Sequence, residues 1–435
     1  MNSKSLYIET YGCQMNEYDS DRIRNAIDAV ETDRAEKADI IIINTCAIRD
    51  KADQKAFSSL GRFKHLKARN PDLIVGISGC VAQLYGDKLL QRMPHLDFVL
   101  GPRAIPRLPE IIGRIRSEKL RPVETSYDIE EIFDVEPHHQ EGKVTAFVSV
   151  QQGCNKRCSY CIVPHVRGNE VNRPLDDILK ETENLVGKGA REVTFIGQTV
   201  NSWKENGYKF GDLLRAAAEI DDLERIRFTT SYPRDITRKM IDALKGVPKV
   251  CRHMHLPVQS GSNRVLGMMK RTYTKEWYSD TVKRLRDAVP DMALSTDIIV
   301  AYPGETDRDF QDTMTLLEEV EFDSAFSFKF SPRPGTPAAE CPEEEIIDEE
   351  KAGRRLTALQ SFQRDITIKK NCERVGLVEH VLVEGTSKNN PDFLTGRTTH
   401  NRITHFPGTK ELTGQIMKVR ITEGLSNSLR GELAV

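Results

Sequence analysis

The stretch "GCNKRCSYC", residues 153–161, holds three cysteines within eight positions, in the spacing C-x3-C-x2-C. The next cysteine along the chain is Cys251, so no fourth thiol lies close by in sequence. A structural zinc ion takes four protein ligands, usually as two short pairs. Three thiols therefore predict a metal site that keeps one coordination position open.

The residues around this stretch predict six strands separated by helix-forming sequence, such as residues 175–189 and 307–321. Six units of this kind indicate an incomplete (β/α) barrel, with the chemistry at the carboxyl ends of the strands. The cysteine triplet follows the first of these strands. The strand-like runs cover residues 145–154, 192–202, 225–233, 253–262, 293–306 and 325–336.

Residues 1–143 predict a separate parallel α/β sheet. Three apolar runs of strand length each end in a small residue followed by a cysteine, and these cysteines are Cys13, Cys46 and Cys80. They are 33 residues (46 minus 13) and 34 residues (80 minus 46) apart, about one strand plus one helix. Because the carboxyl ends of parallel strands meet at one edge, we expect a metal site shared by the three thiols. The alternative is three separate thiols in the core.

The sequence pattern changes to short, alternating, β-branched runs from residue 373, which predict a small OB-like β-barrel. Residues 342–371 predict a long charged helix, and residues 102–143, proline-bearing and partly acidic, predict a linker. The predicted fold class is therefore α/β with three domains. They are an N-terminal parallel sheet at 1–143, a central partial (β/α)6 TIM-like barrel at 144–372 and the small barrel at 373–435.

The composition of the 435 residues is that of an ordinary globular protein, with 38% hydrophobic and 29% charged residues and a net charge of -2. No apolar run approaches the ~20 residues that a membrane span needs, and the N-terminus lacks the apolar core of a signal peptide. We therefore expect a cytoplasmic protein with no membrane partner. Its nine cysteines cannot all pair, and clustered thiols in a reducing cytosol favour metal ligands or catalytic groups.

Two kinds of metal centre fit Cys154, Cys158 and Cys161. Their thiolates can hold three irons of a [4Fe–4S] cluster, which leaves the fourth iron open for a small molecule. Zinc is the alternative, and it would need His165 or a distant residue as its fourth ligand.

The C-x3-C-x2-C spacing after the first strand of a partial βα barrel resembles that of the radical S-adenosylmethionine (radical SAM) enzymes. This resemblance implies that the open iron binds the amino and carboxylate groups of S-adenosylmethionine. It implies that an electron from the cluster cleaves this cofactor to a 5′-deoxyadenosyl radical, which abstracts hydrogen from the substrate. Tyr160, just before the last cysteine, corresponds to the residue that packs against the adenine in these enzymes. The cofactor would carry the difficult chemistry while the protein positions it.

Further segments resemble the radical SAM methylthiotransferase family almost from end to end. They are "YGCQMN", "NTCAIR", "SGCVAQ", "GCNKRCSYCIVP" and "GRTTHNRITHF". The resemblance implies that Cys13, Cys46 and Cys80 bind a second [4Fe–4S] cluster that carries or donates sulfur. It also implies two molecules of S-adenosylmethionine per turnover, an electron donor such as flavodoxin or ferredoxin, and a C-terminal RNA-binding TRAM domain. We expect a monomer.

Gln14, Met15 and Asn16 in "YGCQMN", together with "NTCAIRDKA", are closest to the MiaB-type branch of the family. Enzymes of that branch add a methylthio group to carbon 2 of N6-isopentenyladenosine at position 37, beside the anticodon of tRNA. The resemblance therefore implies the tRNA anticodon stem-loop as the partner. One departure is Thr199 in "GQTVNSW", where the tRNA enzymes usually read "GQNVNS". It leaves the role of that side chain open.

Several other functions stay open as alternatives. The branch that acts on threonylcarbamoyladenosine in tRNA more often resembles "LGCKVN" at the first cysteine, and the branch that modifies a ribosomal protein aspartate resembles "GCPKN". A non-catalytic, metal-containing RNA-binding protein would hold zinc rather than iron and sulfide. An electron-transfer protein with two closed clusters would need four ligands for each, and six in-register cysteines do not reach eight.

Five polar residues lie at or just past predicted strand ends, where cofactor and substrate are expected. They are Gln198, Ser231, Gln259, Ser260 and Asp297. Turn capping explains Ser231 and Ser260 as well. The stretches around Gln259 and Asp297 resemble family segments that line the cofactor pocket.

Contacts to RNA phosphates require cationic side chains. Residues 49–70 carry seven Lys or Arg against two Asp along one predicted helix, and a solvated helix face explains them equally well. From residue 373 onward, eight Lys or Arg face seven Asp or Glu, so no strong basic patch is predicted there. The candidate RNA contacts in this part are Arg397, Asn401, Arg402 and Arg430, with ordinary barrel surface as the alternative.

Overall fold

The structure is a computed structural model that describes residues 4–27, 29–47, 50–128, 132–388 and 390–434, with the backbone alone for 50–53. The chain forms two compact units. Unit 1 comprises Met1–Gln140, Gln151–Arg157 and Cys161–Arg173, and unit 2 comprises Glu141–Val150, Cys158–Tyr160 and Pro174–Val435. The predicted division into three sequence domains stays a prediction.

Unit 1 is built on a six-stranded sheet whose neighbouring strands are all parallel. The order across the sheet is β2 (Ala29–Glu31), β1 (Lys4–Tyr11), β3 (Ile40–Thr45), β4 (Ile74–Gly79), β5 (Phe98–Leu100) and β6 (Val123–Glu124). The three runs that precede Cys13, Cys46 and Cys80 form β1, β3 and β4, and their parallel pairing confirms the predicted sheet. The sequence reasoning missed the short edge strands β2 and β6.

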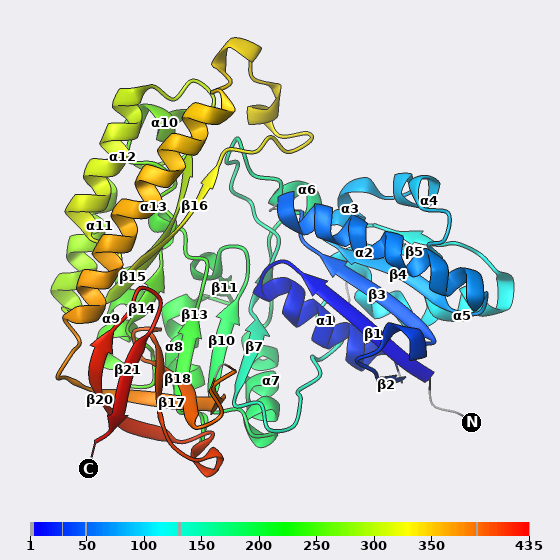
Figure 1. Ribbon diagram of the computed structural model, residues 1–435, viewed down its shortest axis with the longest axis horizontal. Coiled ribbons are helices and arrows are strands. Elements are labelled where there is room, and N and C mark those ends of the chain that lie inside the picture. The colour runs from blue at the N-terminus through cyan, green and yellow to red at the C-terminus, as the bar shows by residue number, and fades with distance from the viewer. Residues whose placement is uncertain (1–3, 28, 48–49, 129–131, 389, 435) are drawn as a thin grey trace. The chain divides into compact units, whose positions relative to one another are not determined.

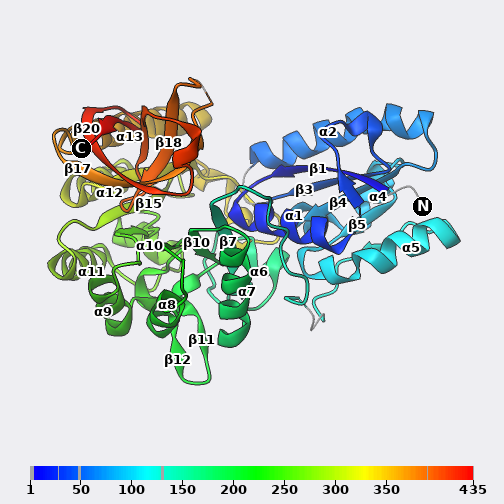
Figure 2. The ribbon, with the colours of Figure 1, turned by 90° about the horizontal axis from the view of Figure 1, so that it is seen from below.

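Helices cover both faces of this sheet (Figure 2). Strand β3 is buried along its whole length, and its side chains alternate between two cores: Ile40 and Ile42 face one, and Ile41 and Ile43 face the other. The helices of unit 1 are α1 (Gln14–Ala26), α2 (Asp50–Arg69), α3 (Cys80–Tyr85), α4 (Lys88–Arg92), α5 (Leu108–Glu118) and α6 (Val163–Arg167).

The prediction of a linker over residues 102–143 is wrong for its first part. Residues 102–107 form a 3-10 turn and Leu108–Glu118 form α5. Ile111, Ile112 and Ile115 recur at helical spacing and are buried against the sheet, so this apolar stripe gives the segment a place in the core. Pro102 and Pro109 lie in the first turn of their helical segments, where a missing N–H costs nothing, while Pro106 lies inside the 3-10 turn.

Unit 2 contains the six predicted strands of the central domain (Figure 1). They form two three-stranded parallel sheets joined by hydrogen bonds from Cys251 N to Ile226 O and from Ser231 N to His255 O. The strands follow the chain order expected of an open (β/α) barrel, which confirms that prediction. They are β7 (Thr145–Ser149), β10 (Glu192–Ile196), β13 (Arg225–Phe228), β14 (His253–His255), β15 (Ala293–Val300) and β16 (Ser324–Lys329).

Seven helices among the described residues belong to unit 2. They are α7 (Leu175–Gly187), α8 (Phe210–Ala218), α9 (Arg238–Gly246), α10 (Asn263–Met268), α11 (Lys275–Ala288), α12 (Asp307–Val320) and α13 (Glu349–Cys372). Together with the strands they enclose one large apolar core that includes Phe195, Trp203, Phe228 and Phe322. Two minor antiparallel strand pairs are also present, β8 (Gln151–Gln152) with β9 (Val171–Asn172) in unit 1 and β11 (Lys204–Glu205) with β12 (Tyr208–Lys209) in unit 2.

The C-terminal part of unit 2 is a closed five-stranded barrel around Val381, Phe406 and Val419, as predicted from the alternating pattern. The strands are β17 (Val378–Thr386), β18 (Phe393–Thr398), β19 (Ile403–Pro407), β20 (Ile416–Gly424) and β21 (Leu429–Leu433). Two arginines of β13 hold this barrel, because Arg225 donates to the carbonyls of His380 and Arg397, and Arg227 donates to that of Thr398.

None of the helices in the described part of the chain is both long enough and apolar enough to cross a membrane.

Candidate iron–sulfur sites

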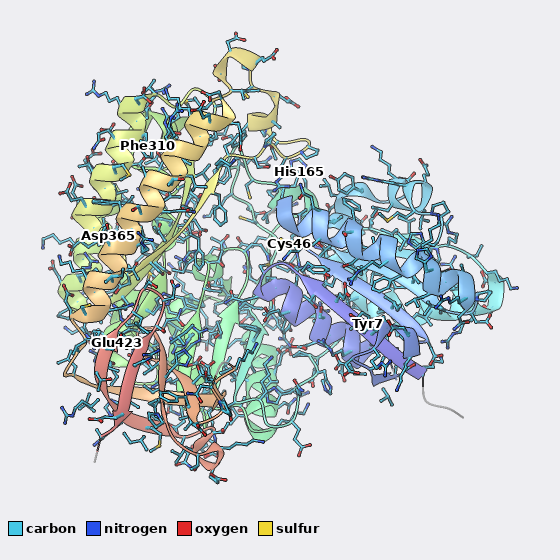
Figure 3. All side chains as sticks on the ribbon, viewed as in Figure 1. Tyr7, Cys46, His165, Phe310, Asp365 and Glu423 are labelled. Carbon is cyan, nitrogen blue, oxygen red and sulfur yellow. The ribbon has the colours of Figure 1, made fainter. Side chains whose placement is uncertain are left out.

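Three thiols of unit 1 meet at the carboxyl edge of the sheet. Cys13 caps α1 directly after β1, Cys46 follows β3 (labelled in Figure 3), and Cys80 begins α3 directly after β4. The strands β1, β3 and β4 are neighbours, so the register of the sheet brings the three cysteines together. The sequence spacing of about one strand plus one helix therefore placed them correctly.

The backbone beside these cysteines leaves no room for further side chains. Gly12 has φ +150°, and a Cβ there would lie 2.5 Å from Cβ of Cys46. Gly79 has φ +91°, and a Cβ there would lie 2.5 Å from the carbonyl oxygen of Thr45. Both positions require glycine, because any larger residue would push neighbouring cysteine-bearing segments apart.

The Cys46 thiol lies between the other two and hydrogen-bonds to both. This contact lowers the pKa of Cys13 to about 7 and the pKa of Cys80 to about 6; burial opposes both shifts, and the Arg167 guanidinium favours them. The same hydrogen bonds, together with burial, raise the pKa of Cys46. Cys13 and Cys80 therefore lose their protons more readily than an ordinary cysteine, which favours the thiolate form that binds iron.

Two buried asparagines fix this edge from behind. Asn16 accepts a hydrogen bond from the Cys13 backbone N–H at 3.3 Å and donates to Oδ1 of Asn44 at 3.2 Å. Asn44 in turn donates to the Asn16 carbonyl at 2.8 Å and to Ser20 at 2.9 Å. The amides tie the loop after β1 to the end of β3, and so hold Cys13 beside Cys46.

The donor set fits an iron–sulfur cluster better than a single ion. In the described part of the chain, no group of three or more His, Cys, Asp or Glu side chains has the compact arrangement that encloses one metal ion. A cubane cluster is a larger body and takes thiolates as its ligands. Three thiols alone at one edge, two of them with lowered pKa, suit that chemistry.

The second set of cysteines lies in the loop after β8. Cys154 and Cys161 belong to unit 1, and Cys158 belongs to unit 2. In unit 1, Gly153 has φ +83°, and a Cβ there would lie 2.1 Å from the carbonyl oxygen of Asn169. The Cys154 N–H donates to the Gly168 carbonyl at 3.1 Å. These contacts fix the start of the loop.

Cys158 has a cationic neighbour in unit 2. Nη1 of Arg271 donates to Sγ of Cys158 at 3.4 Å. The same guanidinium donates to the Tyr273 hydroxyl at 2.7 Å and to the Pro257 carbonyl at 2.9 Å, and lies over the ring of Tyr232. Tyr160, the expected adenine neighbour, packs against a small apolar cluster that includes Val265, Met269 and Tyr302.

The expected cofactor-pocket residues fall into two groups. Gln259 has φ +77° and pairs with β15 through its backbone, donating to the Asp297 carbonyl at 2.9 Å. The Asp297 carboxylate lies 3.3 Å from Nε2 of His255, so these residues meet on one face of the barrel strands. Ser260 instead lies 3.3 Å from the Thr313 hydroxyl on α12, which suits the turn-capping alternative.

Ser231 and Gln198 also follow barrel strands, Ser231 after β13 and Gln198 after β10. The Ser231 hydroxyl is buried and has no hydrogen-bond partner in the described part of the chain, while its N–H donates to His255. Gln198 is half-buried.

The candidate RNA contacts differ in the ion pairs and hydrogen bonds that they form within the protein. Arg402, whose side chain is 11% exposed, pairs with Asp323 and donates to Asn371, so it ties the barrel to the rest of unit 2. Arg397 pairs with Glu384 at 3.2 Å and donates to Asn401 at 3.3 Å. Arg430 is exposed and pairs with Glu423 at 3.1 Å.

Within the basic stretch of residues 49–70, Asp50–Arg69 form α2, as predicted. Residues 48 and 49 lie outside the described residues, and only the backbone is described for 50–53. Lys55, Lys64 and Arg69 are exposed. Arg62 is also exposed but pairs with Glu9 at 3.1 Å.

Comparison with known proteins gives full-length relatives. The chain is 46% identical over 442 residues to the tRNA-2-methylthio-N(6)-dimethylallyladenosine synthase of Aromatoleum aromaticum, covering 99% of each. It is 46% identical over 440 residues to the synthase of the same name from Klebsiella pneumoniae, covering 99% of this chain and 92% of that one. The chain belongs to the tRNA-2-methylthio-N(6)-dimethylallyladenosine synthase family.

Three family models match successive parts of this synthase family member. They are the uncharacterized protein family UPF0004 over residues 5–101, the radical SAM superfamily over residues 148–317 and the TRAM domain over residues 373–434. The radical SAM match implies one [4Fe–4S] cluster and S-adenosylmethionine. These matches and the relatives confirm the family resemblance inferred from the cysteine motifs.

Solved structures confirm the fold. The radical S-adenosylmethionine methyltransferase TsrM from Kitasatospora setae superposes with a TM-score of 0.59 at 15% identity, covering 78% of this chain and 75% of that one. The cobalamin-dependent radical enzyme OxsB superposes with a TM-score of 0.54 at 12% identity, covering 84% of this chain and 56% of that one. At these identities the likeness concerns the fold alone.

Sequence reasoning missed three charged residues of the two cysteine sets: Asp19, Arg167 and Arg271. Their residue types do not distinguish them from surface charges, because each is buried only by contacts that the fold creates. One signal was available for Arg167, which lies six residues after Cys161 (167 minus 161) and therefore had to stay near the metal loop.

Proposed function

We propose that this synthase family member adds a methylthio group to carbon 2 of N6-isopentenyladenosine at position 37, next to the anticodon of tRNA. The observation that carries the proposal is identity of 46% over 99% of the chain to synthases named for this product. The presence of two complete three-cysteine sets supports it, because insertion of sulfur at a C–H position requires both a radical and a sulfur source.

Cys154, Cys158 and Cys161 would hold the radical SAM cluster. When bound, that cluster supplies the electron that cleaves S-adenosylmethionine and starts the radical chemistry. The chain's own residues do the positioning. Arg271 donates to the Cys158 sulfur, and Tyr160 offers an apolar neighbour for the adenine.

Residues past the barrel strands would bind the rest of the cofactor. We assign this role to Gln198, Ser231, Gln259, Ser260 and Asp297. The pairing of Asp297 with His255 and the buried Ser231 hydroxyl support polar contacts at this rim. Ser260 is the least favoured of the five, since its hydroxyl already contacts Thr313.

Cys13, Cys46 and Cys80 would hold a second [4Fe–4S] cluster that supplies the sulfur, and two molecules of S-adenosylmethionine would be used per turnover. The contacts among these three thiols support the assignment. The order of methylation and sulfur transfer rests on the family alone.

The partners follow from the same assignment. We propose that the tRNA anticodon stem-loop contacts the TRAM barrel through Arg397, Asn401, Arg402 and Arg430. Unstacked loop bases can enter a pocket without the cost of opening a duplex. A flavodoxin or ferredoxin would supply electrons, and a monomer working in the cytoplasm suits a tRNA-modifying enzyme.

The test is complementation of a strain that lacks this gene, followed by mass spectrometry of nucleosides from bulk tRNA. We expect the wild-type gene to restore 2-methylthio-N6-isopentenyladenosine, and Cys154→Ala or Cys13→Ala to abolish it. Cys372→Ala is the matched control, because Cys372 is exposed at the end of α13 and should leave the product intact.

An isopentenyladenosine pool that stays unmodified with the wild-type gene would overturn the proposal. Analysis of threonylcarbamoyladenosine and of the ribosomal protein from the same cells would then identify the substrate. Zinc in place of iron and sulfide in protein purified without oxygen would favour a non-catalytic RNA-binding protein.

A further inference from the structure

Arg167 ends the short helix α6 and is completely enclosed in unit 1. Its side chain is only 2% exposed. Its Nε donates a hydrogen bond to Sγ of Cys80 at 3.3 Å. A buried guanidinium therefore touches one thiol of the set formed by Cys13, Cys46 and Cys80.

The carboxylate of Asp19 forms an ion pair with this guanidinium. Nη2 of Arg167 lies 2.7 Å from Oδ2 of Asp19, whose side chain is 2% exposed. Asp19 in turn lies 3.7 Å from Nη1 of Arg22, which also donates to the carbonyls of Ile132 and Val135. Two arginines and one aspartate leave one net positive charge buried beside the thiols.

The backbone around Arg167 is held from several sides. Nε of Arg103 donates to the Arg167 carbonyl at 3.0 Å, and its guanidinium also donates to the Asn169 carbonyl. The Tyr127 hydroxyl donates to the carbonyl of His165. These contacts fix the end of α6, so the direction of the Arg167 side chain is set before any ligand binds.

One donor of this guanidinium remains unused. Nη1 of Arg167 is buried and has no hydrogen-bond partner among the residues that the structure describes. An unsatisfied buried donor on a charged group is costly, and native structures usually satisfy it with a protein group, an ordered water or a ligand. The ion pair with Asp19 accounts for the position of Nη2 but leaves Nη1 without a partner among the described residues.

The partner of Nη1 must be a hydrogen-bond acceptor that can lie beside the thiols of Cys13, Cys46 and Cys80. A cubane cluster held by three thiolates carries net negative charge, and its inorganic sulfides accept hydrogen bonds. Buried charge needs an opposite charge nearby. The reduction potential of such a cluster depends on its net charge and on hydrogen bonds to its sulfurs.

We propose that Arg167 is a positioning residue for the second cluster, donating to the Cys80 thiolate through Nε and to a cluster sulfide through Nη1. This inference rests on the proposed function, in which Cys13, Cys46 and Cys80 bind that cluster. The guanidinium compensates the charge of the cluster, stabilises its reduced form and therefore raises its reduction potential.

The test is potentiometry monitored by electron paramagnetic resonance on the full-length chain carrying Cys154→Ala, Cys158→Ala and Cys161→Ala, which retains only the second site. In this background Arg167→Gln should lower the midpoint potential of the cluster, because a cation and an N–H donor are lost. Arg167→Lys keeps the charge and should give a smaller shift in the same direction.

A second variant guards against loss of folding. Asp19→Asn removes the competing negative charge and should shift the midpoint potential upward, opposite to Arg167→Gln. The double variant removes both partners of the buried Arg167–Asp19 pair, and Arg22 keeps its hydrogen bonds to the carbonyls of Ile132 and Val135, so this variant should fold even if Arg167→Gln does not. Arg62→Gln is the control, because that arginine is solvent-exposed and paired with Glu9.

The outcomes separate the two proposals. If the background protein binds no iron and sulfide, the second cluster of the proposed function fails. If the background protein binds a cluster and Arg167→Gln, Arg167→Lys and Asp19→Asn all leave its midpoint potential unchanged, the inference is overturned. Arg167 is then only a structural counter-ion.

Discussion

Two arginines each direct an N–H at a cysteine sulfur, Arg167 at Cys80 and Arg271 at Cys158. The cysteines were predictable from spacing, since six of the nine fall into two regular sets. The arginines were not, because an arginine that is buried by tertiary contacts looks the same in sequence as one in water. Arg402 shows the same limit, because its place in the sequence offered it as an RNA contact and only the fold reveals its ion pair with Asp323.

Arg271→Lys should slow reductive cleavage of S-adenosylmethionine by about 10- to 100-fold, the usual cost of losing a hydrogen-bond partner of a metal ligand. Lysine keeps the charge but cannot reach Cys158, Tyr273 and Pro257 together. The measurement is 5′-deoxyadenosine formed with dithionite as reductant. Arg252→Lys, at an exposed pair with Asp291, is the control. Equal cleavage by both variants would remove Arg271 from the cofactor machinery.

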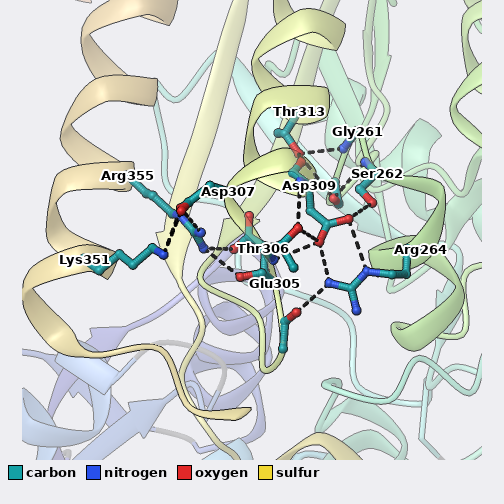
Figure 4. Close-up of polar contacts among 12 residues, drawn as sticks. Gly261, Ser262, Arg264, Glu305, Thr306, Asp307, Asp309, Thr313, Lys351 and Arg355 are labelled. Carbon is teal, nitrogen blue, oxygen red and sulfur yellow. Dashed lines mark hydrogen bonds and ion pairs between the residues drawn. The ribbon is translucent and has the colours of Figure 1, made fainter. Parts of the chain in front are cut away.

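At the scale of elements, the start of α12 carries a carboxylate that accepts several hydrogen bonds (Figure 4). Asp309 accepts from Arg264 and Ser262 and forms a capping box with Thr306. Burial would by itself raise the pKa of Asp309, but these hydrogen bonds outweigh it and hold the pKa well below its usual range. Thr306 and Asp309 are three residues apart, which is the spacing that a capping box needs, whereas the contribution of Arg264 from α10 depends on the fold.

Asp309→Asn should lower the free energy of unfolding by about 2 kcal/mol at pH 7, the usual worth of hydrogen bonds to a charged group. Because the folded-state pKa is lowered, the wild-type advantage is complete above the unfolded-state value of about 4. It should shrink as pH falls below that value toward the folded-state pKa. Urea unfolding of both proteins at pH 7 and at a pH below the unfolded-state pKa measures the difference in stability. A difference that does not change with pH would contradict the prediction. Glu318→Gln, exposed on the same helix, is the control.

At the element scale the N-terminal sheet was also only partly predictable. The central strands stand out as apolar runs buried on both faces. The edge strands β2 and β6 have three and two residues and expose part of their side chains, so no run marks them. Helix α5 was missed because two prolines near its start suggested a linker.

At the scale of the whole molecule, the C-terminal barrel was recognisable by its change of pattern, but its attachment was not. Buried arginines of β13 donate to backbone carbonyls of β17 and β18, and carbonyl groups leave no trace in a sequence. Glu192 pairs with Arg227 at 2.8 Å and keeps that charge compensated. Polar contacts therefore hold the barrel to the rest of unit 2, in addition to the covalent connection through α13.

Arg225→Ala should loosen this attachment without unfolding the barrel core. We expect amide hydrogen exchange in β17 and β18 to speed up at least about tenfold, because two hydrogen bonds from a charged donor contribute more than about 1.4 kcal/mol. Exchange in β20 should change less. Arg215→Ala, exposed on α8, is the control, and unchanged exchange in β17 would show that α13 alone holds the barrel.

The short helix α6 has a consequence for how this gene can vary. Five residues separate Cys161, a proposed ligand of one cluster, from Arg167, the proposed partner of the other. An inserted or deleted codon there would displace one of the two, so natural drift in this stretch is confined to substitutions. Engineers who graft either cysteine set into a new scaffold would have to transplant residues 154–167 as one cassette.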